Sequence, residues 1–278
     1  MKIFYKVSIL LFLILLSCAK EKNKDKKILV ETKTLESQMI EVYNQGLEEL
    51  ERGDPIYAAR KFNEVERIYP QSIWAPRSLL MSAYSYYTYN YYSDAISELE
   101  KFIVKYKNNP RIDYAYYLLA LSHFNQIVDE KKDLNEILKS KKYFNFVVKN
   151  YPNTDFATDA KFKLDLIEEI LASKEMYLAR YYLEKEKWIP AINRFKKVVK
   201  DYQRTIYVEE ALHRLTEIHY RLGLIDESKK YAVLLGYNYQ SSEWYEQSYK
   251  IFNKTFKIQD TNTKTEDSIL KKFKNLFK

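Results

Sequence analysis

The stretch Gly53–Pro70, GDPIYAARKFNEVERIYP, contains the pattern that decides the fold. It places a small residue at Ala58 and apolar residues four and seven positions later, at Phe62 and Val65. Offsets of four and seven lie on one face of an α-helix, so this face is expected to pack against a neighbouring helix. A glycine five residues before the alanine and a proline twelve residues after it mark the two ends of the helix.

The same pattern recurs four times further along the chain. The small residue stands at Ala95, Ser140, Ala191 and Ser228. The apolar residues at offsets four and seven are Leu99 and Phe102, Phe144 and Val147, Phe195 and Val198, and Ala232 and Leu235. The residues five positions before the small ones are Asn90, Asn135, Glu186 and Gly223. All of these but the glutamate tolerate the left-handed backbone conformation that ends a helix.

These spacings predict an all-α tetratricopeptide-repeat superhelix of about five helix–turn–helix units over residues 37–250. The small residues lie 37, 45, 51 and 37 positions apart, whereas the usual repeat is about 34 residues long. We therefore expect inserted or lengthened helices in the middle of the chain, at Asp129–Asn135 and between Thr154 and Ser173.

Residues 1–17 have the layout of a bacterial export signal, with a basic start and an apolar run too short to span a bilayer. Cys18 ends this run and is interpreted as the site of lipid acylation after cleavage, so that acyl chains anchor the mature protein. The alternative is a plain secretory signal with an incidental cysteine or a free thiol. Residues 18–36 are then the lipidated cysteine and a solvated, charged tether, of which Lys20–Thr34 at full extension reaches about 50 Å.

Composition and motifs argue against several classes of protein. Cys18 is the only cysteine, so an exported chain has no internal disulfide and depends on packing for its stability. The net charge of +8 is thinly spread, so we do not expect a nucleic-acid partner. Phosphate-loop, H-E-x-x-H and G-x-S-x-G motifs are absent, and His123, His213 and His219 lack the spacing of a metal site. The sequence predicts no enzyme, no cofactor and no metal.

Tyrosine is concentrated in the first helices of the repeats. The second unit contains Tyr84, Tyr86, Tyr87, Tyr89, Tyr91 and Tyr92, and the third contains Tyr114, Tyr116 and Tyr117. Such helices line the concave face of tetratricopeptide superhelices, and consecutive helical residues point about 100° apart, so some rings are expected to face the groove. The pattern fits binding of an extended apolar-aromatic peptide, and it equally fits packing between helices.

Several segments together resemble the BamD family of outer-membrane assembly lipoproteins. They are Gly53-Asp54 with Ala58-Ala59, Val65–Pro70, Asp113–Leu118, Lys174–Met176, Arg180–Tyr182, Ala191–Phe195 and Asp201–Thr205. With the acylation motif the resemblance covers residues 15 to about 250, and it departs from the family where Lys107 replaces a closing proline. Ala19 rather than Asp after the cysteine is typical of lipoproteins sorted to the outer membrane.

The resemblance implies a periplasmic scaffold, held on the outer membrane by N-terminal acyl chains, that assists insertion of β-barrel proteins. The implied partners are the POTRA domains of BamA, other Bam lipoproteins and unfolded outer-membrane β-barrel proteins. A lipid-anchored scaffold for peptidoglycan-synthesis or cell-division enzymes is the second hypothesis. A degenerate hydrolase is the third, and it predicts a polar catalytic cluster.

The resemblance also implies two sets of site residues. The substrate-peptide groove is assigned to Tyr84, Tyr87, Tyr91 and Tyr116. The BamA side is assigned to Tyr181, Tyr182, Trp188, Asn193 and Arg194. Arg194 is preferred among these because a guanidinium pairs in a bidentate way with a carboxylate, although a solvated helix charge is the alternative.

Residues 251–278 fall outside the resemblance. Near the end, Ile269, Leu270, Phe273, Leu276 and Phe277 share one helical face, and Lys271, Lys272, Lys274 and Lys278 lie elsewhere. The segment predicts a short basic amphipathic helix. Contact with anionic headgroups, insertion into a partner groove, and loose packing on the last repeat all fit this pattern.

Overall fold

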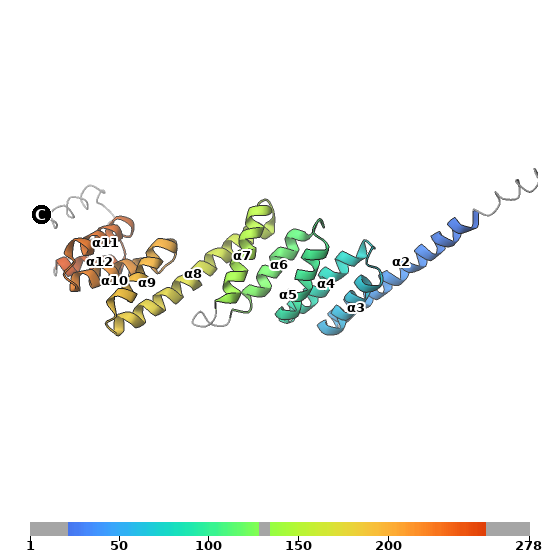
Figure 1. Ribbon diagram of the computed structural model, residues 1–278, viewed down its shortest axis with the longest axis horizontal. Helices are drawn as coiled ribbons and strands as arrows, with labels where there is room; N and C mark the ends of the chain where they lie inside the picture. Colours follow the sequence, from blue (N-terminus) through green and yellow to red (C-terminus); the bar gives the residue numbers. More distant parts are fainter. Residues whose placement is uncertain (1–21, 128–133, 254–278) are drawn as a thin grey trace, which may run out of the picture. The chain divides into compact units, whose positions relative to one another are not determined.

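In the computed structural model the protein is helical throughout the residues that the structure describes, which are 22–127 and 134–253, with side chains from 34 onward (Figure 1). Two compact units follow each other along the chain, the first ending at His123 and the second beginning at Phe124. The export signal, Cys18 and the tail from residue 254 lie outside the described residues. Within the described part of the chain, no helix is both long and apolar enough to cross a membrane.

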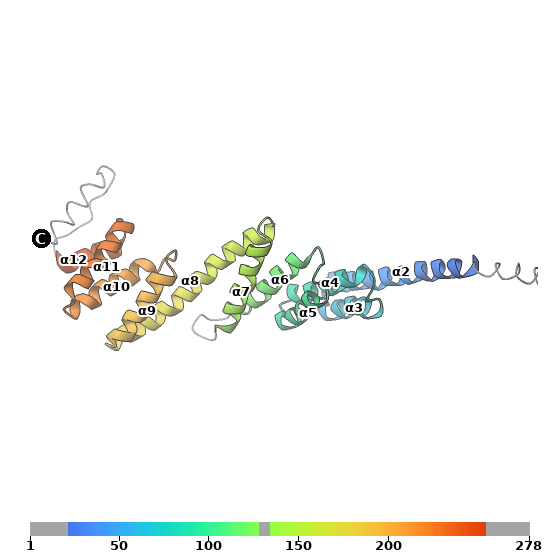
Figure 2. The same cartoon turned by 45° about the horizontal axis from the view of Figure 1, so that its top comes forward.

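The first unit contains α2 (Lys22–Glu51), α3 (Pro55–Ile68), α4 (Trp74–Thr88), α5 (Tyr92–Lys105) and nearly all of α6 (Ile112–Phe124). From α2 to α5, each helix packs against the next one in the chain, as the two views in Figures 1 and 2 show.

The start of α2 corrects the expectation of an extended tether. The backbone is helical from Lys22, because no proline or glycine interrupts the chain before Gly46. Each helical residue spans about 1.5 Å rather than about 3.3 Å, so this part of the chain has less than half the reach expected for it.

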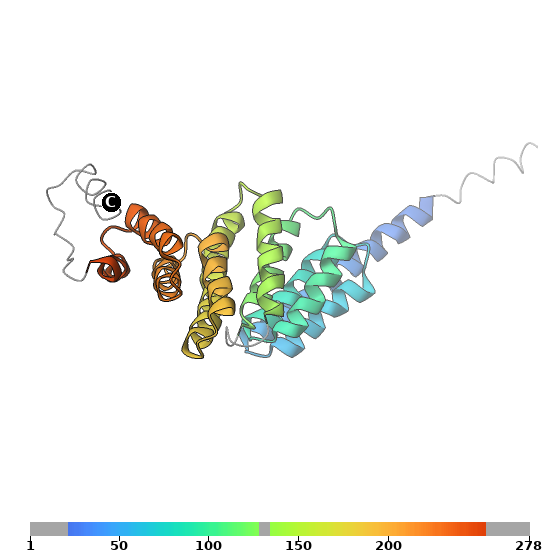
Figure 3. The ribbon, with the colours of Figure 1, turned by 60° about the vertical axis from the view of Figure 1, so that its left-hand side comes forward.

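The second unit contains α7 (Asn135–Asn150), α8 (Asp155–Glu184), α9 (Trp188–Asp201), α10 (Val208–Arg221), α11 (Ile225–Asn238) and α12 (Glu243–Phe252). Each helix again packs against the next, and α12 also contacts α10. Figure 3 shows α8 and α9 side by side. The lengthening expected between Thr154 and Ser173 is confirmed, because α8 runs without a break for 30 residues.

The repeat register is confirmed by burial. All five small residues have no exposed surface: Ala58, Ala95, Ser140, Ala191 and Ser228. The residues at offset seven are equally buried, and so are those at offset four apart from Ala232 at 2%. A side chain larger than alanine or serine at the small positions would hold the paired helices apart.

The turns inside the helix pairs correct one sequence expectation. Gly53, Asn90, Glu186 and Gly223 have positive φ angles of 86°, 65°, 53° and 76°, whereas Asn135 is the first residue of α7. The glutamate is therefore left-handed although its residue type disfavours this conformation by about 1–2 kcal/mol. The N–H of Glu186 donates to the Leu183 carbonyl and that of Lys187 to the Tyr182 carbonyl. This pair of hydrogen bonds closes the helix end and requires the left-handed residue.

A tyrosine at offset eleven ends the second helix of every pair, which the sequence analysis did not notice. The five residues are Tyr69, Tyr106, Tyr151, Tyr202 and Tyr239. In each case the tyrosine N–H donates to the carbonyl of the buried residue at offset seven. The ring follows the last turn of the helix and continues the packed face beyond it.

Candidate functional site

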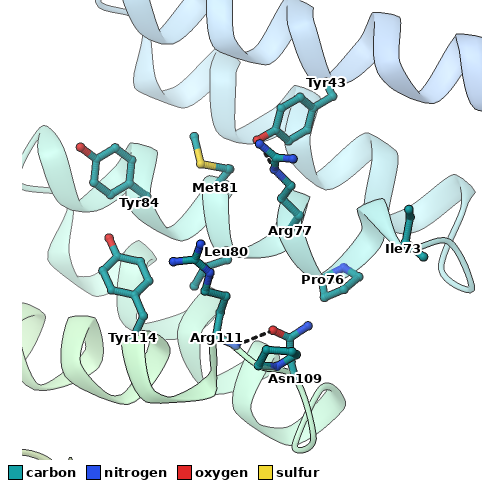
Figure 4. Close-up of a pocket in the computed structure, with 11 residues that line it drawn as sticks. Tyr43, Ile73, Pro76, Arg77, Leu80, Met81, Tyr84, Asn109, Arg111 and Tyr114 are labelled. Atoms are coloured by element: carbon teal, nitrogen blue, oxygen red, sulfur yellow. Dashed lines mark hydrogen bonds between the residues drawn. The ribbon is translucent and has the colours of Figure 1, made fainter. Parts of the chain in front are cut away.

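A pocket of about 640 Å³ lies in the first unit, between α2, α4 and the loop that leads into α6. Its lining residues are Tyr43, Ile73, Pro76, Arg77, Leu80, Met81, Tyr84, Asn109, Pro110, Arg111 and Tyr114. This volume is in the usual range for ligand pockets. The walls combine aromatic and aliphatic side chains with two arginines, and no carboxylate is among the lining residues (Figure 4).

Arg77 is held in place by aromatic side chains. Its Nε donates to the hydroxyl of Tyr43 at 3.1 Å, one of the dashed lines in Figure 4. Its guanidinium also lies over the rings of Tyr43 and Trp74, at 5.3 and 5.1 Å from their centroids. Stacking on rings orients a guanidinium without neutralising its charge. The outer edge of the guanidinium therefore keeps donors for a ligand.

Arg111 supplies the second cation, from the start of the segment that leads into α6. Its backbone N–H donates to the side-chain oxygen of Asn109 at 2.9 Å, which fixes the turn that carries it. Among the described residues, neither Arg77 nor Arg111 forms an ion pair with a carboxylate. Two uncompensated guanidinium groups in an apolar pocket favour an anionic ligand group.

The four tyrosines assigned to the substrate groove do not share one location. Tyr84 lines the pocket. Tyr87 packs its ring against Tyr92 at 5.9 Å, and the Tyr91 ring lies 6.5 Å from that of Tyr86. Tyr116, on α6, is half-buried and is not among the lining residues.

Tyr114 lines the pocket opposite Tyr84, on the helix that carries Tyr116 (Figure 4). Burial, with the phenol groups of Tyr84 and Tyr87 nearby, raises the pKa of Tyr114 to about 12. The hydroxyl therefore stays protonated at neutral pH and remains a hydrogen-bond donor.

One wall of this pocket follows a helical spacing that is visible in the sequence, although the many tyrosines around it make it hard to recognise. Ile73, Arg77, Leu80 and Tyr84 follow one another at intervals of four, three and four residues, which is one face of a helix. Arg77 interrupts an otherwise apolar face of α4, which is the first helix of its repeat. A charged residue at such a position indicates that this face is not buried entirely in the core. The contribution of Arg111 depends on the loop before α6 and has no such periodic signal.

The residues assigned to the partner side lie at the end of α8 and on α9, in the second unit. Arg194 donates from Nη1 to Glu175 Oε2 at 2.7 Å, and Lys197 donates to Glu175 Oε1 at 2.5 Å. Glu175 is only 6% exposed. Burial alone raises the pKa of this carboxyl, but the two hydrogen bonds and the two charges lower it below its ordinary value. Arg194 is therefore an ion-pair partner within the repeat, and its side chain is 38% exposed.

The other four partner-side residues differ in exposure. Tyr181 is 47% exposed, and its ring lies edge-on to the half-buried Tyr182 at 5.6 Å. Tyr182 and Trp188 pack against the core formed by α8 to α12. Asn193 is exposed on α9. Near it in sequence, Ile189 is 74% exposed, a feature that the sequence analysis did not single out.

Paired helices that close on buried alanine and serine residues define a tetratricopeptide-type helical-repeat protein. Its candidate sites are a pocket and an outer helix surface, both suited to holding other polypeptides. In the described residues, no three or more His, Cys, Asp or Glu side chains gather in a way that could hold a metal ion.

Comparison with known proteins identifies the family. Residues 35–234 match the family model YfiO, described as an outer membrane lipoprotein. The outer membrane protein assembly factor BamD of Caulobacter vibrioides is 41% identical over 212 residues, covering 76% of this chain and 70% of that protein. The corresponding factor of Rickettsia prowazekii is 40% identical, covering 76% and 84%. That of Neisseria meningitidis serogroup A is 30% identical, covering 80% and 85%.

Among solved structures, the TPR2AB-domain:pHSP90 complex of yeast Sti1 aligns with a TM-score of 0.42 at 13% identity, covering 77% of this chain and 81% of that one. The chain belongs to the BamD family of outer membrane protein assembly factors. It is an outer membrane lipoprotein and a scaffold rather than an enzyme.

Proposed function

We propose that this assembly factor works through two sites, one for a substrate segment and one for the insertase. In this proposal the pocket of the first unit holds a segment of an unfolded outer-membrane β-barrel protein. The surface formed by the end of α8 and by α9 docks the POTRA domains of BamA. Membership of the family implies that the chain is a component of the Bam complex. The other Bam lipoproteins and the acyl-anchored membrane are the remaining proposed contacts.

The pocket is the observation that carries the substrate part of the proposal. Its aromatic rings and its aliphatic residues suit the apolar side chains of an extended segment. The two guanidinium groups, without a carboxylate of their own among the described residues, suit a carboxylate on that segment. A chain end that carries an aromatic residue and a free carboxylate satisfies both features at once.

We expect Arg77→Gln with Arg111→Gln to weaken binding of such a peptide at least about 10-fold, because each lost charged hydrogen bond is worth about 1.5–3 kcal/mol. Binding is measured by fluorescence anisotropy, with the acylated protein in mild detergent and a labelled peptide from the end of a barrel protein. The same peptide with an amidated terminus should bind the parent protein about as weakly.

Arg67→Gln with Lys107→Gln is the matched control, since it removes two exposed cations from the same unit outside the pocket. Equal losses in the two double variants would show that general positive charge, rather than the pocket, attracts the peptide. Unchanged binding in the pocket variant would remove the two arginines from substrate recognition.

The partner part of the proposal is supported by the exposed Tyr181, Ile189 and Asn193 beside a guanidinium that keeps part of its surface in solvent. Arg194 already compensates Glu175, so a glutamate at this position would face a second, buried carboxylate and destabilise the repeat. A neutral replacement separates docking from folding, because Lys197 continues to hold Glu175.

Arg194→Gln is expected to weaken the BamA interaction roughly 10-fold while leaving helicity unchanged, because a charged hydrogen bond to the partner is lost. The measurement is recovery of BamA after purification in mild detergent, with affinity for isolated POTRA domains as the quantitative readout. Lys200→Gln, an exposed cation on the same helix, is the control. Undiminished binding would exclude Arg194, and recovery of penicillin-binding proteins in place of BamA would favour the peptidoglycan scaffold instead.

A further inference from the structure

The turn between α10 and α11 is aliphatic where the same turn in two of the other repeats is charged. Six and four residues before the small position, the unit of Ser228 has Leu222 and Leu224. The same two positions are charged in the units of Ala58 (Arg52 and Asp54) and Ala191 (Lys185 and Lys187). They are exposed tyrosines in the unit of Ala95 (Tyr89 and Tyr91) and Leu134 with Glu136 in that of Ser140. The two leucines are 43% and 50% exposed. Apolar side chains at positions that otherwise face water indicate a surface that something covers.

This surface extends to both sides of the turn. Tyr220 is 42% exposed and Ile225 is 38% exposed. We call Tyr220, Leu222, Leu224 and Ile225 the terminal apolar patch. The ring of Tyr220 lies edge-on to that of Phe252, with centroids 5.6 Å apart. The described chain thus ends, at residue 253, directly beside the patch.

The chain that continues from this point carries a segment of matching chemistry. Residues 269–277 place Ile269, Leu270, Phe273, Leu276 and Phe277 at intervals that share one helical face. The 15 residues from 254 to 268 separate this segment from Asn253, where the described chain ends. By random-coil statistics, a connection of that length has a root-mean-square span of roughly 20 Å, which corresponds to an effective concentration on the order of millimolar near the patch.

The charges beside the patch are compatible with a basic segment. Arg221 is paired with Glu217, and Lys230 with Glu227. Asp226, next to Ile225, is exposed and forms no ion pair among the described residues. The lysines on the remaining faces of the segment therefore meet an exposed carboxylate, although the charge of Asp226 also acts on Lys230.

We propose that residues 269–277 dock as an amphipathic helix on the terminal apolar patch. The patch flanks the α10–α11 turn, and it is not the face on which a further repeat would stack, because α12 already packs on α10 and α11. A tethered segment with one apolar and one lysine-rich face covers such a patch and leaves its charges in water. This inference does not depend on the substrate or BamA sites proposed above.

The test uses the mature chain with Cys18→Ser, in which introduced cysteines are the only thiols. We expect the pair Leu224→Cys and Phe273→Cys to form an intramolecular disulfide at least about 10-fold faster than the pair Tyr237→Cys and Phe273→Cys. Tyr237 is 74% exposed near the other end of α11 and serves as the matched control. Adding Ile269→Asp and Phe277→Asp to the first pair should slow it to the control rate.

Three results would overturn the proposal. Equal rates for the two cysteine pairs would mean that the segment has no preferred place on α11. Predominant disulfide-linked dimers would identify a second copy as the occupant of the patch. A loss of the intramolecular disulfide on addition of phosphatidylglycerol vesicles would show that the segment prefers an anionic membrane surface. Circular dichroism of each variant checks that the exposed substitutions leave the repeats folded.

Discussion

Replacing Ala191 by aspartate is expected to reduce the free energy of unfolding by at least about 3 kcal/mol and to unfold the repeat formed by α8 and α9. The methyl group of Ala191 has no exposed surface, and it lies where α9 meets its partner helix. Ala191 belongs to a buried apolar cluster, so a carboxylate here would lie among apolar side chains. An uncompensated buried charge typically costs about 3–5 kcal/mol.

The measurement is thermal denaturation followed by circular dichroism, with hydrogen exchange to locate the loss of structure. Exchange should increase in α8 to α10, because α9 packs against both neighbours and their contacts depend on it. Asn193→Asp is the matched control, since it introduces the same carboxylate on the same helix at an exposed position. We expect that control to change stability by less than about 0.5 kcal/mol. A parent-like melting curve for Ala191→Asp would mean that the repeat register is wrong.

The second large effect is a loss of stability on acidification that originates at His213. This histidine is 6% exposed, its Nδ1 lies 2.9 Å from the Ser248 hydroxyl, and its ring lies against Trp244. Burial, with the positive charge of Arg214, lowers its pKa from 6.5 to about 4, although Glu217 and Glu210 act in the opposite direction.

The sign follows from which state takes up the proton. Between pH 6.5 and about pH 4 the unfolded chain protonates this imidazole, whereas the folded chain keeps it neutral. The free energy of unfolding therefore falls as the pH drops through this window, by up to about 3 kcal/mol at pH 4, and this contribution is constant above about pH 7.5.

His213→Asn isolates the effect, because asparagine can keep a hydrogen bond to Ser248 but does not titrate. Urea unfolding between pH 4 and pH 8 should show the parent losing its advantage over the variant as the pH falls. The buried Glu175 carboxyl, whose pKa is also lowered, titrates in both proteins and cancels in the difference. Parallel pH profiles for the two proteins would show that His213 does not carry this dependence.

Much of the fold was predictable because it depends on short-range periodicity. Positions 58, 62 and 65 and their counterparts repeat at offsets set by the helix itself, and burial confirms all five units. The left-handed turn residues were less predictable. Glu186 adopts this conformation because the closing hydrogen bonds of the turn outweigh the preference of a single residue. Asn135 does not adopt it, because it is already the first residue of α7.

The candidate site was predictable only in part. Tyrosine-rich first helices indicated an aromatic surface, but of the four assigned tyrosines only Tyr84 lines the pocket. The ring contacts of Tyr87 and Tyr91 connect residues that face each other across a turn, which helical spacing alone does not reveal. Arg194, chosen as a partner contact, is engaged by Glu175 from the neighbouring helix, and this pairing depends on how α8 and α9 pack.

Residue order alone was enough to specify paired helices, their register and the small residues at which they meet, because each depends on contacts between residues a few positions apart. The set of side chains that line the pocket was determined by the three-dimensional packing. Arg77 and Arg111 are 34 positions apart in the chain, and they share one cavity only because α2, α4 and the loop before α6 come together. Among the described residues, the two guanidinium groups lack a carboxylate partner because of how the repeats pack together. No local pattern in the sequence predicts this.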